Sequence, residues 1–258
     1  MEPIRRIGAV VYGAACYAFF FATFLYLIAF VGNFSVPKTI DSGTPESLGM
    51  SLVIDAVLLA LFGLQHSVMA RPGFKRWFTQ IIPRSVERST YVLLSSAVLI
   101  LLMWQWRPIP TQIFAFESSA GFAVMTSLYV LGYGIVLYTT FLIDHFDLFG
   151  LRQVYLRAFG RPYTEKRFAT PALYKLIRHP LYLGWAITFW AAPVFTVGHL
   201  LFASMMTGYM VLAVPYEERD LADQLGEPYK RWRARTPAVI PRLRGRESAE
   251  SPAVRQVG

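Results

Sequence analysis

The strongest constraint on the fold is a run of about 25 residues, 8–32, that contains no charged side chain. A helix rises about 1.5 Å per residue, so a helix of this length can cross the roughly 30 Å hydrocarbon core of a bilayer. Residues 48–70, 90–106 and 120–143 form three comparable runs, and hydrophobic side chains make up 55% of the 258 residues. This pattern predicts an all-α, polytopic membrane helical bundle rather than a soluble domain.

The last apolar run, residues 181–214, is too long for a single span. Pro193 and Gly198 interrupt it near its middle, and each half is slightly short of a full crossing. We therefore expect a tight helical hairpin, so that the bundle has four spans plus this C-terminal hairpin. A single long tilted helix would instead give five spans and would place the basic C-terminal tail outside.

The 25 Lys and Arg residues are distributed unevenly among the segments that connect these runs. The N-terminus, the segments after the second and fourth runs and the C-terminal tail hold 23 of them, and the other two connections hold only Lys38 and Arg107. Because basic residues concentrate on the cytoplasmic side, both termini are expected in the cytoplasm, which requires an even number of crossings. The predicted location is the inner (cytoplasmic) membrane. The predicted regions are a four-helix membrane bundle (1–143), a core of loop, hairpin and tail (144–232) and a basic tail expected to be disordered (233–258).

Several functional classes find no support in the sequence. Cys16 is the only cysteine, which rules out a disulfide framework and a cysteine-based metal site. The four histidines lack HExxH or comparable spacing, so no metal is expected. The tail lacks interleaved aromatic residues beyond Trp232, which argues against nucleic-acid binding, and no internal repeat indicates a transporter.

Ionisable side chains within predicted spans are costly and are therefore candidates for function. Asp55 and His66 lie eleven residues apart in the second run, on about the same helix face but some 16 Å from each other. Each of the two fits either a site or a structural role. Asp144, His145 and Asp147 are clustered at the end of the fourth run, where they suit either catalysis or helix-end capping.

The predicted hairpin returns two charged pairs to the same membrane surface. It starts at Arg178 and His179 and ends at Glu217 and Glu218. Such a mixed site suits a zwitterionic ligand, because a guanidinium can take a carboxylate by paired hydrogen bonds and a glutamate can take an amine or ribose hydroxyls. Gly184, one turn into the hairpin, lets a ligand or a neighbouring helix come close.

The same segment carries a family resemblance. The stretch "RHPLYLG", followed after the hairpin by "EERDLADQLGEPYKRW", resembles the signature of the isoprenylcysteine carboxyl methyltransferase superfamily of integral membrane enzymes, over residues 174–232. The stretches "GLQHSVMARPGFKRWF", "ERSTYVLLSS" and "DHFDLFGLRQVY" resemble the branch that contains bacterial methanethiol S-methyltransferases. They also resemble a membrane protein family associated with denitrification. Together the resemblance covers residues 48–232.

This resemblance implies S-adenosylmethionine as the cofactor and a methyltransferase fold that is not of the Rossmann type. The absence of a GxGxxG motif in a strand–helix context agrees with it. By the resemblance, the tail closes the cofactor site and the segment before the hairpin adds to it. The residues implied to bind the cofactor are Arg178, His179, Pro180, Leu181, Tyr182, Gly184, Glu217 and Glu218, with Gln153 and Tyr155 from the preceding segment and Tyr229 and Trp232 from the tail.

The implied reaction is S-methylation of methanethiol to dimethyl sulfide. A small thiol is at best as acidic as cysteine, whose reference pKa is about 8.5, so little thiolate exists at neutral pH. A general base or a positive field would therefore help. The catalytic candidates are His66, which is preferred, and His145 as bases, Asp144 or Asp147 to orient a histidine, and Arg71 and Arg152 to add positive potential.

Two alternative functions stay open. Other members of the superfamily methylate a carboxylate or a lipid-linked acceptor, and a non-catalytic membrane sensor or assembly protein could keep the cofactor fold. A small volatile thiol partitions into lipid and can reach a site from the bilayer. A closed aromatic pocket would select such small acceptors by excluded volume, whereas a prenylated acceptor would need a lateral opening.

Overall fold

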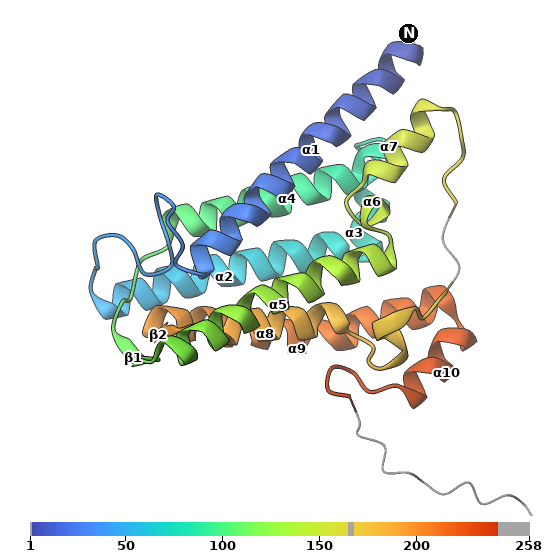
Figure 1. Ribbon diagram of the computed structural model, residues 1–258. Coiled ribbons are helices and arrows are strands. Elements are labelled where there is room, and N and C mark those ends of the chain that lie inside the picture. Colours follow the sequence, from blue (N-terminus) through green and yellow to red (C-terminus); the bar gives the residue numbers. More distant parts are fainter. Residues whose placement is uncertain (1, 165–167, 242–258) are drawn as a thin grey trace, which may run out of the picture.

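The structure, a computed structural model, describes residues 2–164 and 168–241 (Figure 1). Residues 242–258 of the predicted basic tail lie outside the described residues. Within the described part, five helices are long and apolar enough to cross a membrane, which confirms the predicted all-α, polytopic bundle. These helices are α1 (Glu2–Val31), α2 (Leu48–Ala70), α4 (Arg84–Gln105), α5 (Ser119–Ile143) and α9 (Val197–Leu225).

Short helices and strands connect the long helices, and three of the short helices have a proline at one of their first two positions. Pro72, Pro180 and Pro228 each occupy one of the first two helical positions, where the missing N–H costs no intrahelical hydrogen bond. The short elements are α3 (Pro72–Phe78), β1 (Gln112–Ala115), α6 (His145–Leu148), α7 (Leu151–Ala158), the 3₁₀ helix η1 (Ala172–Lys175), α8 (Pro180–Trp190), β2 (Val194–Thr196) and α10 (Glu227–Arg235).

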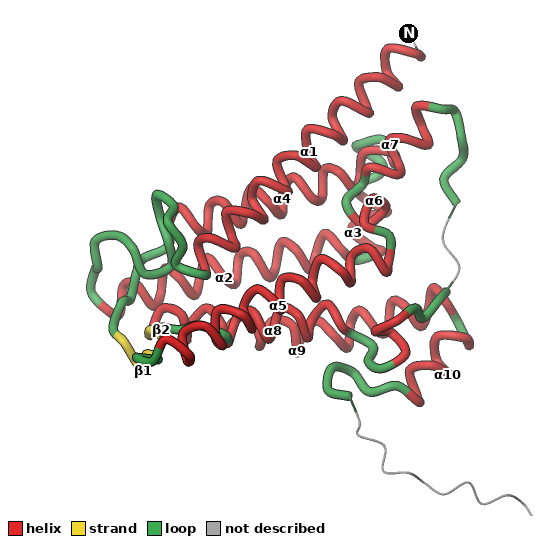
Figure 2. Tube along the Cα trace, in the orientation of Figure 1, coloured by secondary structure: helices red, strands yellow, loops and turns green. Residues whose placement is uncertain are grey.

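The predicted hairpin is present as α8 and α9, but its two arms differ in form. Helix α8 has 11 residues, and the chain then continues in an extended conformation through β2 to the start of α9. Strand β2 pairs antiparallel with β1, which follows α4, with Phe114 opposite Phe195 (Figure 2). These strands were not predicted from the sequence. The continuation of α9 through Pro215 to Leu225 was not predicted either. The extended segment completes the crossing that α8 alone is too short to make.

A close crossing of α5 and α8 fixes the hairpin against the bundle. A Cβ atom added at Gly184 would lie 2.9 Å from the Gly132 carbonyl oxygen and 2.9 Å from the Val136 nitrogen. A Cβ atom added at Gly132 would in turn lie 2.9 Å from the Gly184 carbonyl oxygen. Small residues allow membrane helices to approach in this way. Gly184 therefore serves a helix contact, one of the two roles its sequence position allows.

Asp55 joins α2 to the connection that follows α4. Its side chain is fully buried, and Oδ1 accepts a hydrogen bond of 2.8 Å from the backbone N–H of Arg107. The adjacent Trp106 donates its indole N–H to the Ile40 carbonyl at 2.9 Å, and Arg107 forms an ion pair of 3.2 Å with Glu46. These contacts place Asp55 in the packing of the loops and away from His66.

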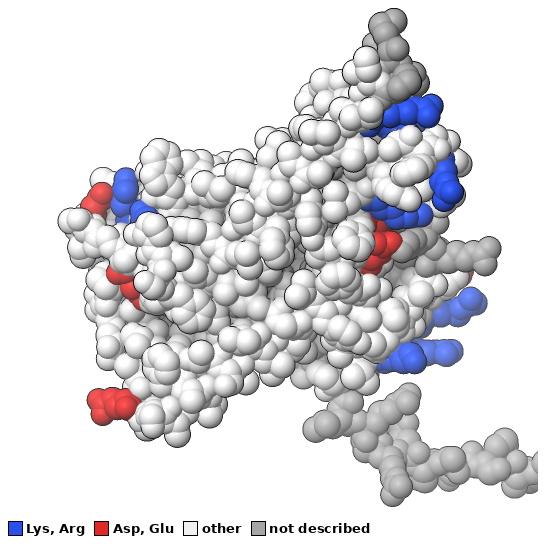
Figure 3. All heavy atoms as spheres, turned by 45° about the horizontal axis from the view of Figure 1, so that its top comes forward, with Lys and Arg blue, Asp and Glu red and all other residues white. Residues whose placement is uncertain are grey.

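Basic side chains gather at the opposite end of the bundle, which we call the basic end. It contains the start of α1, helices α3, α6, α7 and α10, and the end of α9 (Figure 1). Lys and Arg side chains group over this end in the space-filling view, and few lie at the end that carries β1 and β2 (Figure 3). The connections rich in Lys and Arg therefore lie at one end of the bundle, and the two connections with few basic residues lie at the other.

Candidate active site

The two flanks of the hairpin meet in a buried charge cluster at the basic end. Oε1 of Glu218 lies 2.7 Å from Nε of Arg178 and 3.0 Å from Nε2 of His179. Nδ1 of His179 lies 3.9 Å from Oε2 of Glu217. Glu218 and His179 are buried, whereas 40% of the Glu217 side chain is exposed. The structure therefore brings together the cationic and anionic pairs, as the sequence predicts, and leaves Glu217 as the accessible carboxylate.

Arg178 also holds helix α10 in place. Its Nη1 donates to the carbonyl oxygens of Arg233, at 2.7 Å, and Thr236, at 2.8 Å, at the C-terminal end of α10. The backbone N–H groups of Arg178 and His179 both donate to the Ala238 carbonyl. A guanidinium suits this position, because the last carbonyls of a helix lack intrahelical partners.

Aromatic side chains from the tail pack over this cluster. Trp232 donates its indole N–H to the Tyr174 carbonyl at 3.1 Å, and the Phe168 ring lies 5.8 Å from Tyr229 and 5.5 Å from Trp232. Tyr229 is buried, and this burial raises the pKa of its hydroxyl to about 12. The Tyr229 hydroxyl finds no hydrogen-bond partner among the described residues. An unsatisfied buried hydroxyl beside Glu218 is a position where a polar ligand group would fit.

His66 lies between α2 and α4 in a setting of hydroxyl and aromatic side chains. The Tyr91 hydroxyl is 2.9 Å from Nε2 and 3.0 Å from Nδ1 of His66, and Ser95 Oγ is 3.3 Å from Nδ1. The Phe62 ring stacks on the imidazole, with 5.4 Å between centroids. His66 is thus oriented by side chains that carry no charge.

Tyrosine side chains lie beside both His66 and the charge cluster. Tyr91 contacts His66, and the Tyr209 ring lies 6.5 Å from Phe62, which stacks on the same imidazole. The Tyr182 ring is stacked on His179, with 5.3 Å between centroids and 11° between planes. Tyr91 and Tyr209 are not among the residues predicted from the sequence. Tyr91 lies within a stretch that carries the family resemblance, but Tyr209 stands in an uninterrupted apolar run that gives no signal.

Arg71 follows directly after α2, the helix that carries His66, and it contacts α9. Its Nη1 forms an ion pair of 2.8 Å with Asp220 of α9, and its Nε donates to the Ser67 carbonyl at 3.2 Å. The hydroxyls of Ser67 and Tyr209 lie 3.3 Å apart. These contacts tie the end of α2 to α9 beside the charge cluster, and Asp220 balances the charge of Arg71 locally.

His145 occupies a different corner of the bundle, between α1, α5 and α6. Its Nε2 is 2.8 Å from the Tyr17 hydroxyl, its Nδ1 is 2.8 Å from Thr140 Oγ1, and its ring stacks on Phe141 at 4.4 Å. Burial lowers the pKa of His145. A hydroxyl group thus lies 2.8 Å from each ring nitrogen of His145. The neighbouring Asp144 and Asp147 make other contacts.

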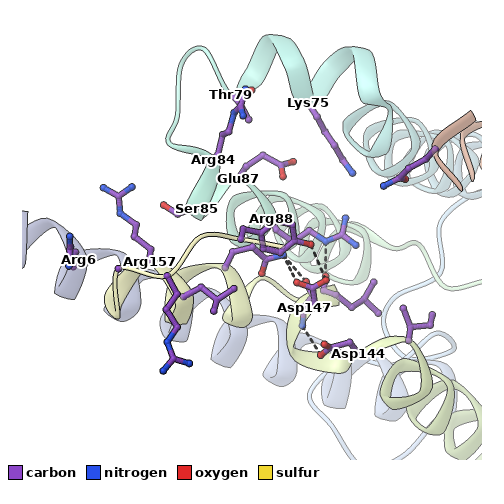
Figure 4. A pocket seen from close by; sticks show the side chains of 18 residues that line it. Arg6, Lys75, Thr79, Arg84, Ser85, Glu87, Arg88, Asp144, Asp147 and Arg157 are labelled. Atoms are coloured by element: carbon purple, nitrogen blue, oxygen red, sulfur yellow. Dashed lines mark hydrogen bonds between the residues drawn. The ribbon is translucent and has the colours of Figure 1, made fainter. Parts of the chain in front are cut away.

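The two aspartates organise the α5–α7 connection. Asp144 caps α6 by accepting the Asp147 N–H at 3.2 Å. Asp147 in turn forms an ion pair of 3.3 Å with Arg152 and accepts a hydrogen bond of 3.1 Å from Gln153. Asp144, Asp147 and Gln153 line a cavity of about 920 Å³ at the basic end (Figure 4). Tyr155 is 54% exposed and packs on Phe159 at 4.7 Å. In the described residues, no three His, Cys, Asp or Glu side chains group in a way that could hold a metal.

The fold and this cluster define a multi-pass membrane protein with a mixed-charge site at the base of a helical hairpin. The chain is 50% identical to methanethiol S-methyltransferase of Crocosphaera subtropica over 92% of its length and 93% of that protein. It is 48% identical to methanethiol S-methyltransferase of Mycobacterium tuberculosis, over 92% of its length and 98% of that protein. The chain therefore belongs to the methanethiol S-methyltransferase family, which confirms the predicted class of enzyme, a methyltransferase.

More distant similarity extends to a second group of proteins. The chain is 30% identical to Nurim of Danio rerio over 67% of its length and 65% of that protein. This similarity agrees with the superfamily inferred from the hairpin motif. No family model and no solved structure matches the chain.

Proposed function

We propose that this protein transfers the methyl group of S-adenosylmethionine to methanethiol, giving dimethyl sulfide and S-adenosylhomocysteine. A new bond forms between the thiol sulfur and the methyl carbon, the bond between that carbon and the sulfonium sulfur breaks with its electron pair, and the thiol proton passes to a base. The observation that carries this proposal is the meeting of Arg178, His179, Glu217 and Glu218 in a chain that belongs to this enzyme family.

The charges of the cluster fit the donor. S-adenosylmethionine carries an ammonium, a sulfonium and a carboxylate, and it supplies an activated methyl group when bound. Two glutamates against one guanidinium leave the cluster net negative when His179 is neutral. Glu217 would take the ammonium or ribose hydroxyls, the unpaired Tyr229 hydroxyl a polar group, and the Arg178 guanidinium the carboxylate. The tail aromatics would exclude water from this side.

His66 is the residue that we propose takes the thiol proton. Its imidazole is held by Tyr91 and Ser95 and has no carboxylate partner among the described residues. His66 lies near the end of α2 that leads into α3 at the basic end, the side of the bundle where the donor would bind. His145 is less suited, because hydroxyls of α1 and α5 engage both its nitrogens.

The distribution of charge supports a cytoplasmic site in the inner membrane. The hairpin cluster lies at the basic end, and segments rich in Lys and Arg stay in the cytoplasm. S-adenosylmethionine is soluble and charged, so it would enter from that side. Methanethiol and dimethyl sulfide are small and apolar enough to move through lipid.

The experiment uses purified full-length protein in detergent with methyl-labelled S-adenosylmethionine. The acceptors are methanethiol, hydrogen sulfide, a prenylcysteine and a phospholipid, each given separately. We expect labelled dimethyl sulfide in the headspace with methanethiol. Glu217→Gln should lower its formation, and Glu227→Gln, which changes a 69% exposed carboxylate on α10, should not.

Labelled prenylcysteine ester without dimethyl sulfide would support a carboxyl methyltransferase instead. Binding of the donor without turnover on any acceptor would support a sensor or assembly protein. Either result would overturn the proposed reaction.

A further inference from the structure

The 920 Å³ cavity at the basic end is distinct from the hairpin cluster. It opens between α1, α3, α4 and α7, and none of Arg178, Glu217, Glu218 or His66 lines it (Figure 4). Three acidic residues, Glu87, Asp144 and Asp147, face six basic ones, so the lining carries an excess of positive charge. The basic residues are Arg6, Lys75, Arg84, Arg88, Arg157 and Arg161.

Much of this positive charge lacks a counterion among the residues that the structure describes. Arg84, Arg157 and Arg161 form no ion pair with any of the described residues. Asp147 already pairs with Arg152 outside this set of six. Burial lowers the pKa of Lys75, and the nearby Arg88 adds to this effect. Cations crowded in this way indicate that an anion belongs among them.

The start of α4 adds neutral donors to the same cavity. The residue before this helix is Pro83, which has no side-chain oxygen to cap the first backbone N–H groups. Ser85, in the first turn, lines the cavity, and its buried hydroxyl has no hydrogen-bond partner in the described chain. Hydroxyl and backbone donors beside arginines are the groups that bind phosphate oxygens.

The surroundings of the cavity place it at the level of lipid headgroups. Trp77 and Ile81, which follow Lys75 in the chain, are 53% and 65% exposed, as expected for side chains at a membrane interface. The α1 residues Ile4, Ile7 and Val11 line an apolar groove of about 620 Å³, on a different face of the helix from Arg6. The first turns of α1 thus also expose apolar side chains, as expected at a membrane surface.

We propose that this cavity binds the phosphate headgroup of an acidic phospholipid, with its acyl chains against the exposed apolar side chains of Trp77 and Ile81. The excess positive charge selects a lipid with net negative charge over a zwitterionic one. The bound headgroup would join α1, α4 and α7, which otherwise present like charges to one another. The hairpin cluster and His66, on which the proposed reaction rests, lie outside this cavity, so this proposal does not depend on the acceptor or the methyl donor.

The test measures lipid binding by the full-length protein in detergent, without methyl donor or thiol. Native mass spectrometry counts bound lipid, and thermal unfolding is followed with added phosphatidylglycerol, phosphatidylcholine or inorganic phosphate. We expect phosphatidylglycerol to be retained and to raise the unfolding temperature more than the other two. The double variant Arg84→Gln/Arg157→Gln should bind phosphatidylglycerol roughly fivefold more weakly for each charge removed.

Two further double variants test whether the binding of phosphatidylglycerol depends on the cavity itself. Arg76→Gln/Arg231→Gln removes the same charge from exposed positions that do not line the cavity and should leave binding unchanged. Arg84→Lys/Arg157→Lys keeps the charge and should retain most of the binding. Equal loss in the Arg76 and Arg231 pair would show diffuse surface attraction and overturn the site.

Other results would overturn the choice of ligand. Stabilisation by inorganic phosphate alone, with none from phosphatidylglycerol, would show that a soluble anion occupies the cavity. Weaker binding of S-adenosylmethionine in Arg84→Gln/Arg157→Gln, with lipid binding intact, would assign the cavity to the methyl donor instead. The reaction proposed above would survive both of these outcomes.

Discussion

Arg178 and Glu218 form an ion pair of 2.7 Å that joins the segment just before α8 to the last third of α9. The two side chains are 17% and 11% exposed, so most of the pair is removed from water. A buried carboxylate requires a partner, because the loss of hydration is otherwise uncompensated. The hairpin therefore closes only in a geometry that also assembles the candidate cofactor site.

Glu218→Gln should destabilise the fold, whereas Glu217→Gln should mainly weaken binding of the methyl donor. Removing one partner of a buried ion pair costs about 3 kcal/mol, so the first variant should unfold at lower temperature or denaturant. Glu217 is 40% exposed and has no ion pair closer than 3.9 Å, so its loss should cost little stability but roughly tenfold in donor affinity. Calorimetric binding and thermal unfolding of both variants check this division. Equal donor affinity in Glu217→Gln and the wild type would remove Glu217 from the site.

His66→Ala should lower turnover on methanethiol by roughly a hundredfold and leave donor affinity within about twofold. The defect should shrink as the pH rises toward the pKa of the thiol, because solvent then supplies the thiolate. Rates from pH 7 to pH 10 for the variant and the wild type measure this convergence. A defect that is constant over that range would contradict the role of base and favour a packing role.

The pH dependence of stability should reveal His145. Because burial lowers its pKa, the folded protein favours the neutral ring. The stabilisation is complete above the ordinary pKa of about 6.5 and is lost as the pH falls below it. Thermal unfolding between pH 8 and pH 5 should therefore show a steeper acid loss in the wild type than in His145→Gln. Turnover of that variant at pH 8, corrected for folded protein, should stay near the wild-type value, and a hundredfold loss would restore His145 as a base.

Gly184→Ala should destabilise the bundle, and Gly208→Ala should not. The new Cβ at position 184 would meet backbone atoms of α5 at 2.9 Å, so the helices must separate, at a cost of about 1–3 kcal/mol. The new Cβ at position 208 meets nothing within 4 Å. Comparing the thermal unfolding of these two variants separates close packing from the general effect of removing a glycine. Equal stability of both variants would show that α5 and α8 do not cross closely.

The long helices and the hairpin were predictable, because charged side chains are costly in lipid. Membrane helices therefore appear in the sequence as long uncharged runs. The strands β1 and β2 were not, since three or four residues within apolar connections give no periodic signal. The charge cluster was predictable from the hairpin alone, because Arg178 and Glu218 flank it.

Other contacts depended on tertiary packing that no local pattern records. His145 and its neighbouring aspartates suggested a catalytic unit, yet Asp144 adopts φ of 120° at the end of α5 and His145 contacts Tyr17 of α1 instead. Tyr91 meets His66 only because α2 and α4 are adjacent in space. The predicted roles of these residues await the measurements above.

The two hydrogen bonds from Arg178 to the Arg233 and Thr236 carbonyls make one side chain part of both the charge cluster and the attachment of α10. In the proposed reaction, S-adenosylhomocysteine would leave past α10, and these two hydrogen bonds would have to break first. Methanethiol and dimethyl sulfide would instead move through lipid. Movement of α10 would then limit the rate of product release, whereas the movement of the volatile compounds through lipid would not.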